Sequence, residues 1–381
     1  MNNKINNCLI DSYNRKIDYL RLSVTDRCNL RCIYCMPADG IKLYKQNEVL
    51  SYEEVLKAVK ILAELGIKKV RLTGGEPLLR ENILRLIGSL GKIKGIEDIS
   101  LTTNGILLLK YAEKLRDLGI KRVNISLDTL DPDKYRKITR GGDLKAVLNS
   151  IDRALMAGIS NIKINVVISD YLDEKDIEGF ISMAFNKPFH VRFIEAMQAP
   201  FSQEDISNIE CSSTSGSEFK VGKNQFELKD YQFGLKKHDI ILKKIFLIMR
   251  QFGDFVREEK PVGFGPAIYY RIKESRGSVG FILNDKIYCS ACNRLRLSSS
   301  GSLQLCLFSD LKLDLKSMLR QGKKEEEIRA EILDFVKAKP ENREEICRFN
   351  YKNDNKNSNK INNKNRVCSS LNLKLSDYMS K

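Results

Sequence analysis

The stretch YLRLSVTDRCNLRCIYCMP, residues 19–37, joins a strand pattern directly to a cysteine-rich loop. From Leu20 to Ser23 apolar and polar side chains alternate, and this period of two residues predicts a β-strand with one apolar and one polar face. Three cysteines follow at once with the spacing C-x3-C-x2-C. The fold depends on how the chain repeats this strand, and the chemistry depends on the cysteines.

Six short runs of this kind alternate with longer runs of helical period, which predicts repeated βα units and a parallel sheet. The helical run SYEEVLKAVKILAELG, residues 51–66, begins with Ser51 and Glu54 in the pattern of a capping box and ends at Gly66. The strands are expected at residues 19–24, 68–74, 96–104, 122–128, 162–169 and 190–196.

The polar faces of these strands distinguish between two α/β architectures. Parallel strands that are covered on both faces are apolar on both faces, whereas a curved sheet with outer helices can present a polar row to a wet centre. We therefore predict an α/β fold, an open (βα)6 partial TIM barrel. The facing of the sixth strand stays undecided, because Arg192 and Glu195 have opposite parity. The polar row of the first five strands contains Arg21, Ser23, Arg71, Thr73, Thr102, Asn104, Asn124, Ser126, Lys163 and Asn165.

The βα rhythm is expected to end after the barrel, which we assign to residues 1–197. Residues 198–260 are a divergent connecting segment, with a helix predicted in KKHDIILKKIFLIMRQFGDFV. Residues 261–349 form a smaller C-terminal α+β region that includes the helical run KEEEIRAEILDFVKA. Residues 350–381 are rich in Asn and Lys, which predicts a disordered tail.

The charge balance is strongly basic, with 65 Lys and Arg against 49 Asp and Glu and a formal net charge of +16. Such a surplus attracts nucleic acid, phosphorylated small molecules or an anionic membrane. No apolar run approaches 18 residues and the N-terminus lacks the apolar core of a signal peptide, so we expect a cytoplasmic protein without a membrane span. In that reducing compartment the 10 cysteines are expected as metal ligands or reactive thiols.

The first cysteine triplet consists of Cys28, Cys32 and Cys35. Three thiolates on one loop can bind three irons of a [4Fe-4S] cluster and leave the fourth iron open to a small molecule. A zinc site would need a fourth ligand that the sequence does not identify. Burial alone does not explain three cysteines interspersed with Arg27 and Arg31. The spacing favours a cluster.

The second triplet, Cys289, Cys292 and Cys306, has the spacing C-x2-C-x13-C. By spacing alone, a cluster and a structural zinc with a fourth ligand from elsewhere are equally good interpretations. A third motif, GGEP at residues 74–77, follows the second predicted strand. By itself it is best explained as a glycine turn closed by proline.

LRLSVTDRCNLRCIYCMP resembles the signature of the radical S-adenosylmethionine enzymes and, more narrowly, that of the GTP 3′,8-cyclase family. The similarity covers most of residues 11–197 and resumes from about 261 to 340. It implies a radical lyase that converts GTP to 3′,8-cyclo-7,8-dihydro-GTP in the first step of molybdenum cofactor biosynthesis. In that reaction a 5′-deoxyadenosyl radical abstracts the 3′ hydrogen of the ribose, and the ribose radical then adds to C8 of the guanine.

The resemblance also implies ligands for both triplets. The open iron of the first [4Fe-4S] cluster would be chelated by S-adenosylmethionine, and the second triplet would hold another [4Fe-4S] cluster whose open iron meets the guanine of GTP. The implied S-adenosylmethionine contacts are Tyr34, Gly75, Ser126 and Met197. The implied GTP contacts are Arg21, Arg71, Thr102, Lys163, Arg294, Leu295 through its backbone, and Arg296.

Several partners follow from the same resemblance. They are a reductant such as flavodoxin or ferredoxin, and cyclic pyranopterin monophosphate synthase as the downstream enzyme. A homodimer is left open, and neither a membrane nor a nucleic acid is expected as a partner.

Two features depart from the family pattern. Family members end in a Gly-Gly pair that reaches into the active site, whereas this chain ends LSDYMSK and has no glycine after Gly322. The sequence therefore predicts ligand binding with slow or absent turnover. Residues 198–260 also differ from the family.

Two other functions stay open at this point. One is a related radical enzyme that acts on another substrate such as a peptide. The other is a basic, zinc-stabilised nucleic-acid-binding protein. The absence of Trp and the lack of interleaved basic and aromatic residues argue against the latter.

Overall fold

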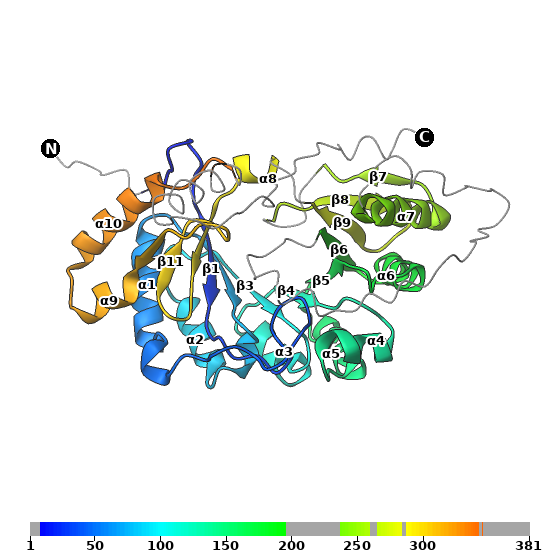
Figure 1. The fold of residues 1–381 in the computed structure, drawn as a ribbon, viewed down its shortest axis with the longest axis horizontal. Helices are drawn as coiled ribbons and strands as arrows, with labels where there is room; N and C mark the ends of the chain where they lie inside the picture. The colour runs from blue at the N-terminus through cyan, green and yellow to red at the C-terminus, as the bar shows by residue number, and fades with distance from the viewer. Residues whose placement is uncertain (1–7, 196–236, 260–264, 284–286, 343–344, 346–381) are drawn as a thin grey trace, which may run out of the picture.

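The computed structural model describes residues 8–195, 237–259, 265–283, 287–342 and 345. Within this part of the chain one 12-stranded sheet runs in the order β12-β11-β10-β1-β2-β3-β4-β5-β6-β9-β8-β7 (Figure 1). The strands are β1 (Tyr19–Ser23), β2 (Lys69–Thr73), β3 (Asp98–Thr103), β4 (Arg122–Ser126), β5 (Asn161–Ile168), β6 (Phe189–Glu195), β7 (Phe255–Arg257), β8 (Ile268–Ile272), β9 (Ser278–Ile282), β10 (Arg294–Leu297), β11 (Ser302–Gln304) and β12 (Lys312–Asp314).

Strands β1 to β6 are parallel and neighbour one another in chain order, which confirms the predicted open barrel of six βα units. The parallel arrangement continues beyond them, because β10 pairs in parallel with β1 and β9 pairs in parallel with β6. The strands farther out are antiparallel. The C-terminal region therefore extends the barrel sheet at both edges.

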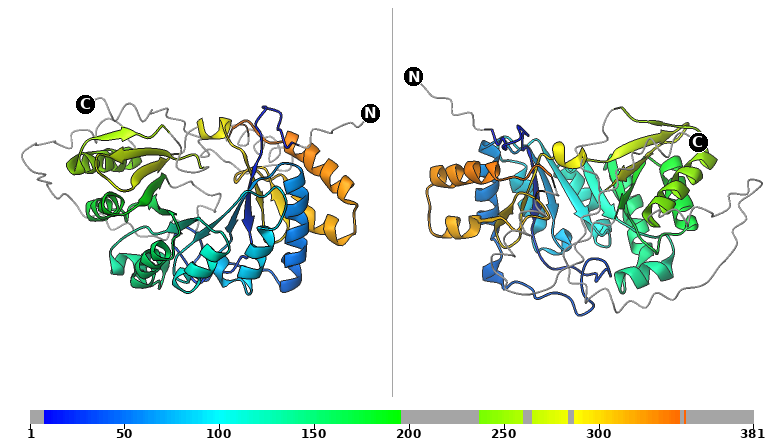
Figure 2. Two further views of the ribbon diagram at one scale, coloured as in Figure 1. Left: turned by 180° about the vertical axis from the view of Figure 1, so that it is seen from behind. Right: turned by 45° about the horizontal axis from the view of Figure 1, so that its top comes forward.

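The barrel helices lie outside the curved sheet in both views of the ribbon (Figures 1 and 2). They are α1 (Tyr52–Glu64), α2 (Ile83–Leu90), α3 (Leu108–Asp117), α4 (Pro132–Thr139), α5 (Leu144–Met156) and α6 (Glu174–Asn186), with short 3-10 turns η1 (Gln46–Glu48) and η2 (Pro77–Leu79). The later helices are α7 (Lys237–Phe252), α8 (Ile287–Ser290), α9 (Leu315–Arg320) and α10 (Glu325–Lys337).

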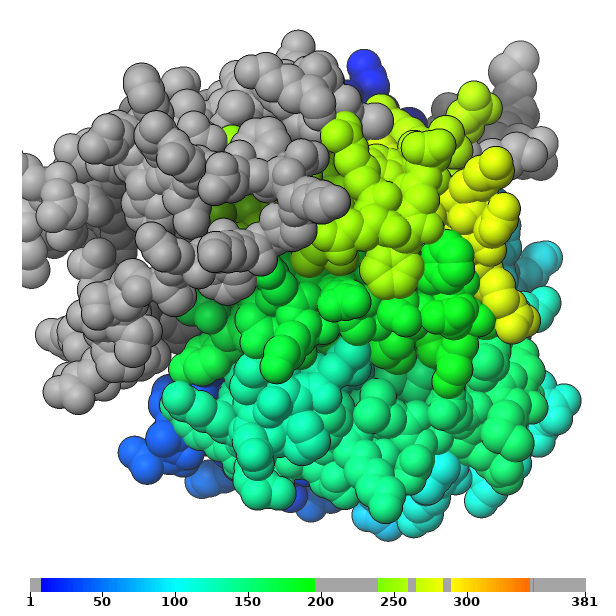
Figure 3. Space-filling view, turned by 90° about the vertical axis from the view of Figure 1, so that its right-hand side faces the viewer, coloured from blue at the N-terminus to red at the C-terminus, as the bar shows by residue number. Residues whose placement is uncertain are grey.

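Helix α7 confirms the helix predicted in the connecting segment. Its Phe246 stacks on Phe281 of β9 with ring centroids 4.9 Å apart, and its Lys244 pairs with Glu174 of α6 at 2.9 Å. Figure 3 shows this side of the molecule, where the segments around α4 to α6 and the segment of α7 and β8 form a continuous surface. The helix is thus part of the layer that covers the barrel.

The two faces of the strands differ as the alternation predicts. Leu20 and Leu22 of β1 are fully buried in the core under the helices. The cross-strand register places Leu20 between Val70 and Leu295, whereas Arg21 lies between Arg71 and Arg296. Because side chains alternate between faces, the arginines line the face opposite the helices.

Helix α1 begins with the predicted capping box. The backbone N–H of Glu54 donates to Ser51 Oγ at 3.2 Å, and the N–H of Ser51 donates to the Glu54 carboxylate at 2.7 Å. Glu54 also accepts from Arg320 Nε of α9 at 2.6 Å, which fastens the C-terminal region to the barrel.

None of the helices in the described ranges combines the length and the apolar character needed to cross a membrane.

Replacing Ser51 with Ala should lower the free energy of unfolding by about 1 kcal/mol, because the hydroxyl that caps the first turn is lost. Urea denaturation of the anaerobic protein, followed by circular dichroism, measures the change. Lys60→Ala, on an exposed position of the same helix, is the control and should change stability by less than about 0.5 kcal/mol. Equal effects in the two variants would contradict the capping role.

Candidate functional site

The loops after β1 and β2 are joined by backbone hydrogen bonds at the C-terminal ends of the parallel strands. The N–H of Gly75 donates to the carbonyl of Thr25 at 2.9 Å, and the N–H of Glu76 donates to the carbonyl of Arg27 at 2.8 Å. A Cβ built on Gly75 would lie 2.2 Å from the carbonyl oxygen of Arg27. Only glycine permits this approach, so GGEP holds the cysteine loop against the second strand.

Glu76 is a buried residue that the sequence interpretation did not assign to the site. Its carboxylate accepts from Thr103 Oγ1 at 2.8 Å and from the N–H of Asn104 at 2.7 Å, and burial raises its pKa to about 7. The side-chain amide of Asn104 then reaches the sulfur of Cys28 at 3.9 Å. The end of β3 is thereby linked to the first cysteine of the triplet.

Tyr34 connects the same loop to the strands farther along the sheet. Its ring is 45% exposed, and its hydroxyl donates to Asp128 Oδ2 at 2.6 Å. The other oxygen of Asp128 accepts from the N–H of Val167 at 2.8 Å. Ser126 is the last residue of β4 and lies at the same C-terminal end of the strands. Tyr34, Gly75 and Ser126 therefore come from the ends of three parallel strands, while Met197 lies outside the described residues.

The first three thiols lie in an environment that disfavours bare thiolates. Burial raises the pKa of Cys32 to about 12, and the nearby charges of Asp128, Cys35 and Cys28 add to this effect. Burial likewise raises the pKa of Cys28 and Cys35. Binding of a cationic metal centre would relieve this repulsion and displace the protons, so the donor set suits an iron-sulfur cluster.

The described part of the chain contains no three His, Cys, Asp or Glu side chains that converge on one metal ion. A four-iron cluster does not require such convergence, because each cysteine binds a different iron.

The polar face between the strand ends gathers cations that are partly or fully buried. Arg21 pairs in register with Arg71 and Arg296, and burial together with these two neighbours holds its pKa well below the ordinary value. Lys163 is 4% exposed, and burial followed by the charges of Arg192 and Arg71 lowers its pKa to about 6. These cations repel one another, and an anionic ligand on this face would compensate their charge.

Aromatic rings and polar side chains line the same face. Arg71 lies over the ring of Tyr19, 5.3 Å from its centroid, and the ammonium of Lys163 lies 5.7 Å from the ring centroid of Tyr269. Thr102 pairs in register with Asn124, which in turn pairs with Lys163. Leu295, in contrast, is fully buried in the apolar core, so only its backbone is available to this face.

Arg192 is the principal residue that the sequence interpretation missed. It is 3% exposed, and its guanidinium donates to Asn124 Oδ1 at 2.7 Å and to Asn165 Oδ1. The parity that it shares with His190 was the available signal, which Glu195 obscured. Within the described chain, the Nε atoms of Arg21 and Arg192 are buried without a hydrogen-bond acceptor.

The second triplet lies at the other end of the parallel strands, where they begin. Cys289 and Cys292 precede β10, whose first residue, Arg294, pairs with Tyr19 at the start of β1. Cys306 follows β11, which runs antiparallel to β10 and returns to that end of the strands. Figure 1 shows the same separation, with α8 at the top of β1 and the loop that follows β1 at the bottom.

The second triplet also has the opposite electrostatics. Burial raises the pKa of Cys292, but Lys339 and Arg294 lower it by more, and the net value is about 7. Burial thus raises the thiol pKa values of the first triplet, whereas nearby cations lower that of Cys292 in the second.

Two family models match the chain. The Radical SAM superfamily model matches residues 22–184, and the Molybdenum Cofactor Synthesis C model matches residues 227–345. The GTP 3',8-cyclase of Pelotomaculum thermopropionicum is 42% identical over 332 residues, which cover 87% of this chain and 94% of the relative. The GTP 3',8-cyclase of Thermodesulfovibrio yellowstonii is also 42% identical, over 333 residues and with the same coverage.

Solved structures of low identity share the fold. Streptococcus suis SuiB bound to S-adenosylmethionine matches with a TM-score of 0.51 and 13% identity, over 84% of this chain and 69% of that one. Native anSMEcpe with bound AdoMet matches with a TM-score of 0.50 and 17% identity, over 86% of this chain and 82% of that one.

Replacing Gly75 with Ala should reduce the iron that the first triplet binds to less than about half, because the added Cβ would clash with the carbonyl of Arg27 and push the cysteine loop away from β2. The measurement is iron and sulfide content after anaerobic reconstitution, in a chain whose Cys289, Cys292 and Cys306 are replaced by Ser. Gly91→Ala is the control, since its Cβ would meet no atom closer than 3.7 Å. Full iron loading of the Gly75 variant would refute the steric argument.

Proposed function

The chain belongs to the GTP 3',8-cyclase family of radical S-adenosylmethionine enzymes, and we propose that it binds GTP on the cation-lined face between its two cysteine triplets. The family reaction, the cyclisation of GTP, is the first step of molybdenum cofactor biosynthesis. The observation that carries the proposal is the group of partly or fully buried cations on the inner face of the sheet, between the strand ends that carry the two triplets.

The first triplet, Cys28, Cys32 and Cys35, would hold a [4Fe-4S] cluster with S-adenosylmethionine on its open iron. When bound, this pair supplies one-electron cleavage of the cofactor and abstraction of a hydrogen atom from the substrate. The proposed cofactor contacts are Tyr34, Gly75, Ser126 and Met197. The hydrogen bond from Tyr34 to Asp128 supports this assignment, since it ties the cysteine loop to the end of β4, where Ser126 lies.

The second triplet, Cys289, Cys292 and Cys306, would hold a second [4Fe-4S] cluster that binds the guanine end of GTP. Its position at the start of the parallel strands supports this assignment, because the substrate would then lie between the two clusters. Arg294 and Arg296 alternate with Leu295 on β10, so both cations share the face that the substrate would occupy.

The triphosphate would bind the cations on the polar face. Burying an ammonium or guanidinium costs several kcal/mol unless an anion compensates it, and the buried Nε atoms of Arg21 and Arg192 have donor capacity to spare. Arg21, Arg71 and Lys163 would bind phosphate oxygens. Thr102 and Asn124 would add neutral hydrogen bonds beside Lys163.

Positioning is the main task of these residues. The walls of the proposed site are β-strands whose outer faces are packed under helices, so the cations are held on a rigid surface. A fixed triphosphate keeps the ribose at one distance from the first triplet, and a largely buried surface keeps water away from reactive groups.

The remaining assignments complete the proposal. A small electron carrier such as flavodoxin or ferredoxin would reduce the clusters in the cytoplasm, and cyclic pyranopterin monophosphate synthase would take the product. A homodimer is compatible with this scheme.

Two clusters with different tasks can be separated by mutation. Reconstituted wild-type chain should bind about eight irons, four per cluster. Replacing Cys28, Cys32 and Cys35 with Ser should abolish cleavage of S-adenosylmethionine, measured as 5′-deoxyadenosine. Replacing Cys289, Cys292 and Cys306 should retain much of that cleavage while weakening GTP at least about tenfold, or 1.4 kcal/mol. Formation of 3′,8-cyclo-7,8-dihydro-GTP by the wild-type chain tests the reaction itself. Zinc at both triplets, or equal loss of cleavage in both variants, would reject the proposal.

Lys163→Met should weaken GTP binding by about 10-fold to 150-fold, the cost of one charge-assisted hydrogen bond. It should also change the proton balance. With a pKa of about 6, Lys163 is largely neutral at pH 7.5 in the free protein, and a neighbouring triphosphate would raise that pKa. Binding should therefore take up about one proton, and affinity should fall as pH rises above about 6.

Anaerobic calorimetry in buffers of different ionisation enthalpy measures this uptake. Lys175→Met, which removes an exposed charge from α6, is the control and should behave as the wild type. If Lys163→Met binds GTP with the proton uptake of the wild type, Lys163 does not contact the triphosphate.

A further inference from the structure

The segment that leaves α10 contacts the second cysteine triplet through a buried lysine. Lys339 is 3% exposed, and its ammonium donates to the carbonyl of Arg294 at 2.9 Å and to the carbonyl of Leu305. Arg294 lies two residues after Cys292, and Leu305 immediately precedes Cys306. One side chain therefore ties together the two chain segments that carry these cysteines.

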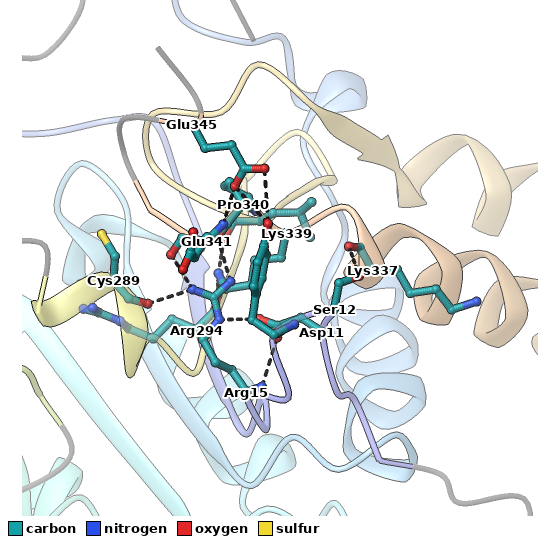
Figure 4. A network of polar contacts seen from close by, with 12 residues as sticks. Asp11, Ser12, Arg15, Cys289, Arg294, Lys337, Lys339, Pro340, Glu341 and Glu345 are labelled. Atoms are coloured by element: carbon teal, nitrogen blue, oxygen red, sulfur yellow. Dashed lines mark hydrogen bonds and ion pairs between the residues drawn. The ribbon is translucent and has the colours of Figure 1, made fainter. Parts of the chain in front are cut away.

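The third cysteine is tied to the same segment by Arg15. Its guanidinium donates to the carbonyl of Cys289 at 2.7 Å, to that of Glu341 at 2.8 Å and to that of Pro340 at 2.6 Å. Arg15 is itself held by Asp11 at 2.6 Å, in a pair that is almost fully buried. Figure 4 shows how the guanidinium lies between Cys289 and residues 340–341.

The N-terminal hairpin closes over this arrangement. Ser12 Oγ donates to the carbonyl of Lys337 at 2.7 Å (Figure 4). The hydroxyl of Tyr13 donates to the Glu345 carboxylate at 3.2 Å. Lys339 thus contacts the segments beside Cys292 and Cys306, and Arg15 links Pro340 and Glu341 to Cys289.

The two buried cations differ in what balances their charge. Arg15 is neutralised by Asp11, so it acts mainly through its hydrogen bonds. Burial lowers the pKa of Lys339, and so do the charges of Arg15 and Arg294, whereas the sulfurs of Cys292 and Cys306 act in the opposite direction. A buried ammonium is stabilised when the sulfur centre beside it becomes more negative.

We propose that Lys339 is a positioning residue and the buried counter-charge for an iron-sulfur cluster on Cys289, Cys292 and Cys306. It holds two of the three ligand segments at their cluster-binding separation, and its charge favours the reduced state of the cluster. Arg15 holds the third segment. The inference rests on the second cluster of the proposed function, and no catalytic role is assigned to either residue. The potential of an iron-sulfur centre follows its hydrogen bonds and surrounding charge, so both effects can be measured.

The test uses the full chain with Cys28, Cys32 and Cys35 replaced by Ser, so that iron reports the second triplet alone. This parent chain should bind about four irons after anaerobic reconstitution. Lys339→Met should reduce that content to less than about half. In the cluster that remains, it should lower the equilibrium constant for one-electron reduction at least about tenfold, which is about 59 mV.

Two further variants separate charge from position. Lys339→Arg keeps the charge and should shift the potential by less than half as much as Lys339→Met. Arg15→Lys keeps the pair with Asp11 but cannot reach three carbonyls at once, so it should lower iron content without shifting the potential. Lys337→Met is the control, because Lys337 is exposed and pairs with Asp334 at 3.3 Å. Redox titration followed by electron paramagnetic resonance gives the potentials.

The outcomes distinguish this inference from the proposed function. A parent chain without iron overturns both the second cluster and the role of Lys339. A parent with about four irons and an unchanged Lys339→Met variant overturns the role of Lys339 alone. As a folding check, Lys339→Met in an otherwise unchanged chain should still bind about four irons on the first triplet. Loss of those irons as well would make Lys339 a general folding residue and overturn the inference.

Discussion

Like charges that lie side by side and partly buried on the inner face of the sheet are the constraint on which the rest of the structure depends. Arg21, Arg71 and Arg296 are neighbours in register, and Lys163 and Arg192 continue the same face. Such a row is costly in a folded protein unless something compensates it. Asn124 and Asn165 satisfy part of the hydrogen-bonding capacity of Arg192, but they carry no charge. The electrostatic cost is met by the apolar packing on the opposite face, where Leu20, Leu22 and their neighbours are fully buried under the helices.

The sheet then determines where the two triplets lie. In a parallel sheet the loops that follow the strands lie at one end of the strands, and the loops that precede them lie at the other end. Cys28, Cys32 and Cys35 follow β1, whereas Cys289 and Cys292 precede β10, which is parallel to β1. A ligand that neutralises the cations would therefore extend from one triplet toward the other. Cations on the inner face of the sheet suit a small anionic ligand better than a nucleic acid on the outer surface.

Each triplet is held by contacts from remote parts of the chain. The first loop depends on the backbone of Gly75 and on the Asn104 amide beside Cys28, while the second depends on Lys339 and Arg15. Apart from the Asn104 amide, which reaches the sulfur of Cys28, these contacts are made to backbone groups and fix the path of each loop. Their electrostatic surroundings differ, since burial raises the thiol pKa values of the first triplet and cations lower that of Cys292. The two sites are therefore suited to different chemical tasks within one sheet.

The architecture and the cysteine triplets could be predicted before the structure, because local patterns encode both. Alternation with a period of two gave both faces of β1 to β5, and the capping box marked the start of α1. Arg192 could not be assigned from its own strand, since Glu195 has the opposite parity; the register with Asn165 decided its face. The pairing of β10 with β1 and of β9 with β6 was also not readable, because hydrogen bonding between strands distant in sequence leaves no local signal. The same holds for Lys339 and Arg15. A lysine after a helix and an arginine near the N-terminus look like solvated surface, and only tertiary packing buries them against the carbonyls beside the cysteines.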